Sequence, residues 1–160
     1  QMVSLAYSIF IIFIIMTLVF RSITGGLLAT LPMVASVAMM FGLMGYLDIP
    51  LNMTTSMLTG ILVGVGVDYT VHFLWHLRDH IKYGDTLDEA IANTFLISGK
   101  GILFNGLSVI VGFSALLFSV FVPVQIFGIL VMASISFCLF GALATLPALI
   151  SLLNPKFLYR

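Results

Sequence analysis

The sequence predicts an all-α, polytopic membrane helix bundle with five transmembrane helices and one short cytoplasmic amphipathic helix. Of its 160 residues, 61% are hydrophobic and only 8% are charged, whereas soluble domains carry roughly 25% charged residues. The apolar residues also fall into five long runs. Each run is close to or longer than the ~20 residues that a helix needs to cross a bilayer.

The five predicted spans are separated by short polar stretches. The first break is a turn over residues 22–26, the second is a connector over residues 47–52, and Val122–Pro123 makes a tight turn before the last span. Two prolines fall inside runs, which membrane helices tolerate. The predicted spans cover residues 2–20, 27–46, 53–77, 102–121 and 124–153 of a single transmembrane domain, 1–160. Because residue 1 is Gln and no signal peptide precedes it, we interpret the chain as a piece of a longer protein.

The longest polar segment is the connector over residues 78–100. Gly84 is placed to end the third helix as a C′ glycine. Thr86 and Glu89 then have the spacing of a capping box, which starts a helix. The apolar residues that follow share one face, so we expect a short amphipathic helix on the membrane surface. It either covers the end of the bundle or docks a partner.

The basic residues predict the orientation of the chain. With five alternating spans, all of them fall on one side of the membrane, and the connectors on the other side hold only Asp48. The positive-inside rule makes the basic side cytoplasmic. We therefore expect the N-terminus outside and the C-terminus in the cytoplasm, in a bacterial or archaeal plasma membrane. The basic residues are Arg21, Arg78, Lys82, Lys100, Lys156 and Arg160.

Asp68 is the residue that points to a function. It lies in the third run, ten residues before Arg78, which puts it about 15 Å into the membrane at the rise of an α-helix. A charge at the centre of a membrane helix costs about 2.5–3.5 kcal/mol. An acid kept at such a depth is a functional-site hypothesis by default, and a purely structural buried acid is the alternative.

The neighbours of Asp68 form a row along one helix face. Gly60, Gly64, Asp68, His72 and His76 are each four residues apart, and residues at this spacing lie above one another. Glycines on such a face let another helix approach closely. An imidazole one turn from the acid titrates near neutral pH and could pass protons to it; otherwise it is a histidine hydrogen-bonded within the bundle. No carboxylate or cysteine joins the histidines at ligand spacing, so no metal site is expected.

Two further groups of residues are candidates for supporting this site. Gly66 and Gly112 are expected to pack helices in the same way as the glycines of the row. On the fourth span, Asn105 and Ser108 begin a polar stripe near one face. We expect the stripe to pack against the Asp68 face and to supply the hydrogen bonds that an ionised acid needs. The alternative is a stripe that only joins helices.

Several functions are excluded by the same sequence. The formal net charge is zero, which gives no basis for a nucleic-acid partner. The glycines Gly64 and Gly66 do not form a nucleotide site, because no strand precedes them and the Walker lysine is absent. No Ser–His–Asp arrangement is suggested by spacing. No catalytic residue, and hence no enzyme, is predicted.

Specific motifs resemble a known family of transporters. The run Gly-Val-Gly-Val-Asp-Tyr at residues 64–69, followed by His72 and Phe73, resembles the fourth-helix motif of the resistance–nodulation–division superfamily, in its MMPL-like exporter branch. The resemblance covers nearly the whole chain. Its other motifs are Phe20-Arg21-Ser22, Leu31-Pro32, Ile49-Pro50-Leu51-Asn52, Gly84 to Ile91, Gly99 to Ser108, Gly112-Phe113, Gln125 to Gly128, and Leu146-Pro147-Ala148-Leu149.

This resemblance implies an architecture and a mechanism. Such transporters have two repeats of six spans, each with an extracytoplasmic domain after its first span. The present chain is similar to spans two to six of one repeat, so its implied partners are the second repeat and the porter domains, with a homo-oligomer also open. The implied function is proton-driven export of a hydrophobic or lipidic substrate, powered by the proton gradient without a cofactor. Asp68 and Tyr69 would form the proton relay, with Tyr69 bonding the other repeat's acid; a packing tyrosine is the alternative.

Two other functions stay open at this point. Five-span bundles of the superfamily also resemble sterol-sensing domains, which bind and report lipid without pumping it. Those domains carry paired acids where this chain has Asp68-Tyr69, and this departure favours the exporter. The third interpretation is an assembly or scaffold subunit.

Overall fold

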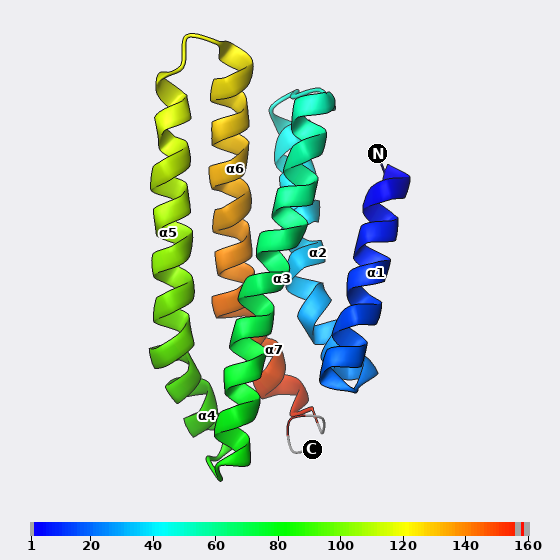
Figure 1. Cartoon of the computed structure of the whole chain (residues 1–160), viewed down its shortest axis with the longest axis vertical. Coiled ribbons are helices and arrows are strands. Elements are labelled where there is room, and N and C mark those ends of the chain that lie inside the picture. The colour runs from blue at the N-terminus through cyan, green and yellow to red at the C-terminus, as the bar shows by residue number, and fades with distance from the viewer. Residues whose placement is uncertain (1, 156–157, 159–160) are drawn as a thin grey trace.

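The computed structural model describes residues 2–155 and 158, and every regular element in that part of the chain is helical (Figure 1). Within it, five helical segments are long and apolar enough to cross a membrane. The predicted fold class is therefore confirmed. The helices are α1 (Met2–Phe20), α2 (Ile23–Tyr46), α3 (Met53–Lys82), α4 (Leu87–Thr94), α5 (Lys100–Ser114), α6 (Val122–Phe140) and α7 (Leu146–Leu153).

The spans are arranged around three central helices. α2, α3 and α6 pack against one another, while α1 lies at one edge of the bundle and α5 at the other (Figure 1). About half of the central apolar segments is buried in this chain (44–50%), against 11% for the spans that contain α1 and α5. The two edge helices therefore turn most of their surface to lipid or to a partner. The largest fully buried side chains include Phe20, Met33, Met40, Leu62, Phe73, Leu130 and Ile135.

The described basic residues gather at one end of the bundle, which we call the basic end. Arg21 follows α1, Arg78 and Lys82 lie in the last turns of α3, and Lys100 starts α5 (Figure 1). Asp48 lies in the connector at the opposite end. The described positive charges are thus confined to one end of the bundle, as expected. The remaining basic residues, Lys156 and Arg160, lie outside the described residues.

The second span begins earlier than predicted. Residues 22–26 were expected to form a turn, but α2 starts at Ile23, and the Ser22 hydroxyl caps it by accepting a hydrogen bond from Gly25 N–H at 3.4 Å. Gly26 lies inside the helix, where a Cβ would collide with Thr17 of α1. Gly26 therefore serves close packing between α1 and α2, and only Arg21 and Ser22 turn the chain.

The connector between the third and fourth spans forms largely as predicted. α3 ends at Lys82, and Gly84 follows with φ of 101°, a left-handed conformation that suits glycine. At the start of α4, the Glu89 carboxylate accepts hydrogen bonds from the Thr86 backbone N–H at 3.0 Å and from its hydroxyl at 2.7 Å. The Asp85 carboxylate bonds His80 Nδ1 at 3.0 Å, which ties this connector to α3.

α4 is not a separate surface helix, which corrects one expectation. It passes without a loop through a π-helical turn, Phe95–Gly99, into α5. Ala90 and Thr94 are fully buried against the bundle, so α4 is held by packing as well as by its amphipathic character. The last part of the fourth span is a 3₁₀ turn, Ala115–Phe118.

The final span also differs in detail from the prediction. The chain turns at residues 119–121, and Val122 and Pro123 instead form the first turn of α6. A proline is favoured there because the first helical N–H groups have no intrahelical partner. A second π-helical turn, Gly141–Thr145, joins α6 to α7. Asn154, with φ of 38°, then ends α7.

Candidate functional site

The predicted row on α3 opens into a cavity of about 290 Å³, which we call the polar cavity. It lies between α3 on one side and the π-helical turn and α5 on the other. All of its ionisable groups come from α3, whereas α5 and the turn contribute uncharged residues. Its lining residues are Asp68, Tyr69, His72, His76, Ile97, Ser98, Gly101, Ile102 and Asn105.

The two residues of the predicted relay point in different directions. Asp68 is exposed on the surface of this chain. It makes no hydrogen bond to any described residue. Tyr69 is only 3% exposed, and its hydroxyl lies inside this chain's own bundle without a hydrogen-bond partner among the described residues. Pairing of this phenol with an acid of another repeat stays a prediction.

The residues predicted to support the relay divide into two groups. His72 and Asn105 both line the polar cavity with Asp68, so the structure brings the α3 row and the α5 stripe together at this point. Ser108 lies one turn further along α5, is exposed, and donates its hydroxyl hydrogen to the Phe104 carbonyl at 2.8 Å. The hydroxyl hydrogen of Ser108 is therefore already bonded within α5.

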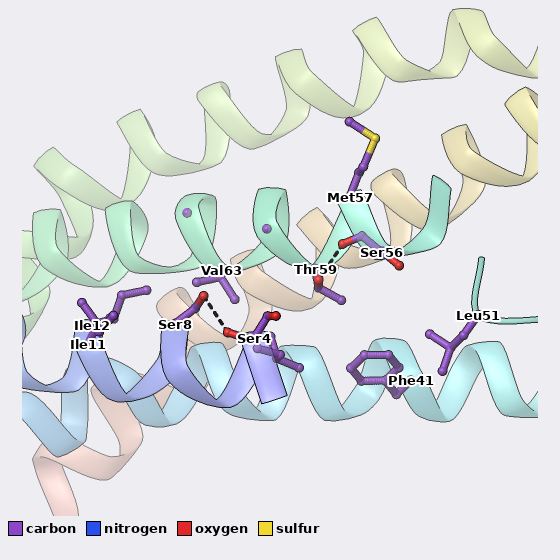
Figure 2. A pocket seen from close by; sticks show the side chains of 13 residues that line it. Ser4, Ser8, Ile11, Ile12, Phe41, Leu51, Ser56, Met57, Thr59 and Val63 are labelled. Carbon is purple, nitrogen blue, oxygen red and sulfur yellow. Dashed lines mark hydrogen bonds between the residues drawn. The ribbon is translucent and has the colours of Figure 1, made fainter. Parts of the chain in front are cut away.

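A second and larger hollow, the apolar cleft, lies between α1, α2 and α3 toward the end of the bundle opposite the basic end (Figure 2). Its volume is about 680 Å³, within the range of about 300–1,000 Å³ that is usual for small-molecule sites. No residue with a formal charge lines it. Its lining residues are Ser4, Leu5, Ser8, Ile11, Ile12, Phe41, Leu51, Ser56, Met57, Thr59, Gly60, Val63 and Gly64.

Three of the four hydroxyl groups in the lining of the apolar cleft are bonded to their own chain, all but that of Ser4. Ser8 donates to the Ser4 carbonyl at 3.0 Å, and Thr59 donates to the Ser56 carbonyl at 2.7 Å (Figure 2). Ser56 in turn donates to the Asn52 carbonyl at 2.7 Å. Because these donors are satisfied locally, the cleft has little demand for polar groups from a ligand.

The row on α3 lines both hollows. Gly60 and Gly64 belong to the apolar cleft, while Asp68, His72 and His76 belong to the polar cavity. Each step of four residues rotates by about 40° around an α-helix, because four residues exceed one full turn. The row therefore winds from the α1 side of α3 to its α5 side.

The glycines that pack helices are partly different from those predicted. Gly66 is in close contact, because a Cβ there would lie 3.2 Å from Met33 and 3.3 Å from Cys138. At Gly60, Gly64 and Gly112, an added Cβ would meet no described atom of another element within 4 Å. Packing of these three against something outside this chain stays a prediction. The close approaches that sequence reasoning missed are at Gly26, Gly106, Gly128 and Gly141.

Ser98 is the cavity residue that sequence reasoning did not single out. The π-helical turn carries its side chain to the polar cavity. No sequence pattern marks a π-helical turn, although such turns are frequent at functional sites. The only local hint of an irregular backbone is the run Gly99-Lys100-Gly101, which directly follows Ser98.

Comparison with known proteins gives one family. The profile of the MMPL family matches residues 1–159. The chain is also 32% identical over 139 residues to the membrane protein MJ1562 of Methanocaldococcus jannaschii, a match that covers 87% of this chain and 36% of that protein. The chain thus spans about a third of the length of this relative. No solved structure matches. The chain belongs to the MMPL family.

Proposed function

Because the chain belongs to the MMPL family, we propose that it is the membrane part of a proton-driven exporter of hydrophobic or lipidic substrates. MMPL proteins are membrane transporters, and the multi-pass bundle is consistent with that role. Proton binding and release at Asp68 changes how α3 packs against its neighbours. This movement drives domains outside the membrane, which the chain does not contain, to pass the substrate.

The observation that carries the proposal is the position of Asp68. The carboxylate lies midway along α3 and opens into the polar cavity beside His72, His76 and Asn105. Carboxylates and imidazoles inside a membrane protein are the groups used in proton relays. A charge exposed to lipid is costly, so a second membrane repeat or another subunit covers this face of α3 and α5 in the assembled transporter.

The orientation follows from the division of charge between the two ends. The basic end faces the cytoplasm by the positive-inside rule. The polar cavity then lies on the cytoplasmic side of Asp68, and the apolar cleft lies in the outer half of the membrane. Protons pass between Asp68 and the cytoplasm on the side of the histidines, and lipidic substrate is met on the other side.

The test is Asp68→Asn in the full-length protein, reconstituted in vesicles with a proton gradient. We expect proton-coupled transport to fall about a hundredfold or more, since direct proton-transfer groups contribute that much. Asp88→Asn, an exposed acid on α4, is the matched control and should transport normally. Full transport by Asp68→Asn would remove the relay.

A second candidate is a lipid-binding regulatory domain, and the apolar cleft favours it. A hollow of about 680 Å³ lined by aliphatic side chains, one phenyl ring and locally satisfied hydroxyls suits a lipid tail or a sterol. The two candidates differ in energetics. A sensor binds lipid without dissipating the proton gradient, so simultaneous measurement of lipid binding and proton flux separates them.

A further inference from the structure

The seven buried serine and threonine residues of the bundle follow one rule with two exceptions. Outside these seven, the enclosed hydroxyl of the half-buried Thr17 on α1 also lacks a described partner. Five of the seven buried serine and threonine side chains donate to a main-chain carbonyl three to five residues earlier in the chain. Among the seven, only Thr94 and Ser98 have a hydroxyl with no hydrogen-bond partner among the described residues. Both exceptions lie at the π-helical turn Phe95–Gly99, one directly before it and one inside it.

The π-helical turn explains why Ser98 departs from the rule. In an α-helix, a serine hydroxyl reaches the carbonyl four residues earlier, as Ser134 does with Leu130 at 2.6 Å. A π-helical turn shifts the backbone pairing to five residues and widens the helix. Thr145 in the second π-helical turn donates to the Phe140 carbonyl five residues earlier at 3.4 Å. The hydroxyl of Ser98 makes neither bond, although the side chain is only 9% exposed.

The surroundings of Ser98 indicate what takes the place of that acceptor. Ser98 and Tyr69 both line the polar cavity, and both have a buried hydroxyl without a described partner. The Ser98 oxygen itself is enclosed, so contact with water in the cavity requires a rotation about χ1 to another staggered well. A cavity of about 290 Å³ has room for several water molecules, each of which needs two to four polar partners.

We propose that Ser98 is a positioning residue that binds water in the polar cavity, and that this water connects Asp68 with His72 and His76. The proposal rests on the proton relay proposed above. In each transfer, one O–H or N–H bond forms as another breaks, so a proton passes between Asp68 and the aqueous phase at the basic end and no water is consumed. The titratable groups facing this water are Asp68, Tyr69, His72 and His76 of α3, and the facing turn and α5 contribute none to the lining.

The first test asks whether water reaches Ser98. Ser98→Cys is made in the full-length protein, in a background where Cys138 is alanine, and is treated in membranes with a small water-soluble methanethiosulfonate. Ser136→Cys, an exposed position on α6 that lines neither hollow, is the matched control facing lipid. The thiolate is the reactive form of cysteine, and a thiol ionises only where water is present. We therefore expect Ser98→Cys to react with the methanethiosulfonate at least about tenfold faster than Ser136→Cys. Equal rates would overturn the proposal.

The second test asks whether the hydroxyl serves proton transfer. Ser98→Ala should slow proton flux about tenfold at high pH, where protons are scarce, and much less at low pH. Ser98→Thr keeps the hydroxyl and should restore the wild-type pH profile. A loss of similar size at every pH, or no rescue by threonine, would overturn the proposal.

The two proposals can fail separately. If Asp68→Asn abolishes proton coupling while Ser98→Ala has the wild-type pH profile, the relay stands and the role of Ser98 is wrong. If Asp68→Asn transports normally, the relay is wrong. The labelling of Ser98→Cys then still reports whether the cavity holds water.

Discussion

The apolar cleft and the polar cavity are lined by the same helix but suit opposite chemistry. The cleft has no residue with a formal charge in its lining, and three of its four hydroxyls bond main-chain carbonyls nearby in the chain. The cavity holds a carboxylate and two imidazoles, and two of its buried hydroxyls lack described partners. The difference shows that one row of residues, winding around α3, can present a ligand-sized apolar surface at one end and a titratable site at the other.

The largest expected effect comes from moving a charge between the two hollows. Gly64→Asp places a carboxylate in the apolar cleft, one turn from Asp68. The new charge meets no ionisable or oppositely charged side chain in the lining of the cleft, so we expect a loss of about 2.5–3.5 kcal/mol of stability, measured by unfolding in mixed micelles. Gly64→Asn is the uncharged control and should lose clearly less. Equal tolerance of a carboxylate in both hollows would break the comparison.

The next effect concerns the wall of the cleft formed by α1. Gly26→Ala introduces a Cβ that collides with Thr17, and overpacking of this kind costs about 1–3 kcal/mol. Gly45→Ala, in the same helix with no described atom of another element within 4 Å, should be neutral or stabilising. A thermal unfolding series of the two variants in detergent measures the difference. If both behave alike, the contact between α1 and α2 is not as tight as described.

A third change fills the cleft without disturbing the packing. Gly60→Leu adds a side chain where no described atom of another element lies within 4 Å, so stability should be retained. Binding of a fluorescent fatty acid should weaken about tenfold, because the added side chain occupies apolar volume of the site. Gly112→Leu is equally open on α5 and lines neither hollow. Its lipid binding should match the wild type, and equal weakening in both would locate the lipid elsewhere.

The smallest effect separates two members of the predicted stripe on α5. Asn105→Ala removes an amide from the wall of the polar cavity. Under the proposed relay this amide bonds water in the cavity. Loss of one such hydrogen bond, worth about 0.5–1.5 kcal/mol, should lower proton flux severalfold. Ser108→Ala should leave the flux unchanged, because this hydroxyl bonds the Phe104 carbonyl. A larger effect at Ser108 would mean that the stripe acts as a whole.

Local chemistry made much of the fold predictable from the sequence. The five spans, the Gly84 helix end and the Thr86–Glu89 contact depend on residues close together in the chain, and all are found. Asn105 and Asp68 line one cavity, as the polar stripe led us to expect. α5 packs mainly on α6, however, and no hydrogen bond joins these two described residues.

What could not be predicted depends on how helices tilt and irregular turns form. Gly26 was expected in a turn, since only the approach of α1 reveals why the helix needs a glycine there. The π-helical turn that carries Ser98 into the polar cavity leaves no mark in the hydrophobic pattern. The apolar cleft arises because α1 packs mainly on α2 and little on α3, which no local spacing encodes.

The way α1 is attached to the bundle determines how large a ligand the apolar cleft can hold. Its only buried apolar side chains among the described residues, Met16 and Phe20, lie in its last two turns, beside the Thr17–Gly26 contact. The first three turns contribute only partly buried side chains, Leu5, Ile9 and Ile12, at the margin of the core. A bulkier ligand in the apolar cleft is therefore accommodated when α1 tilts about its last two turns, while α2, α3 and α6 keep their packing.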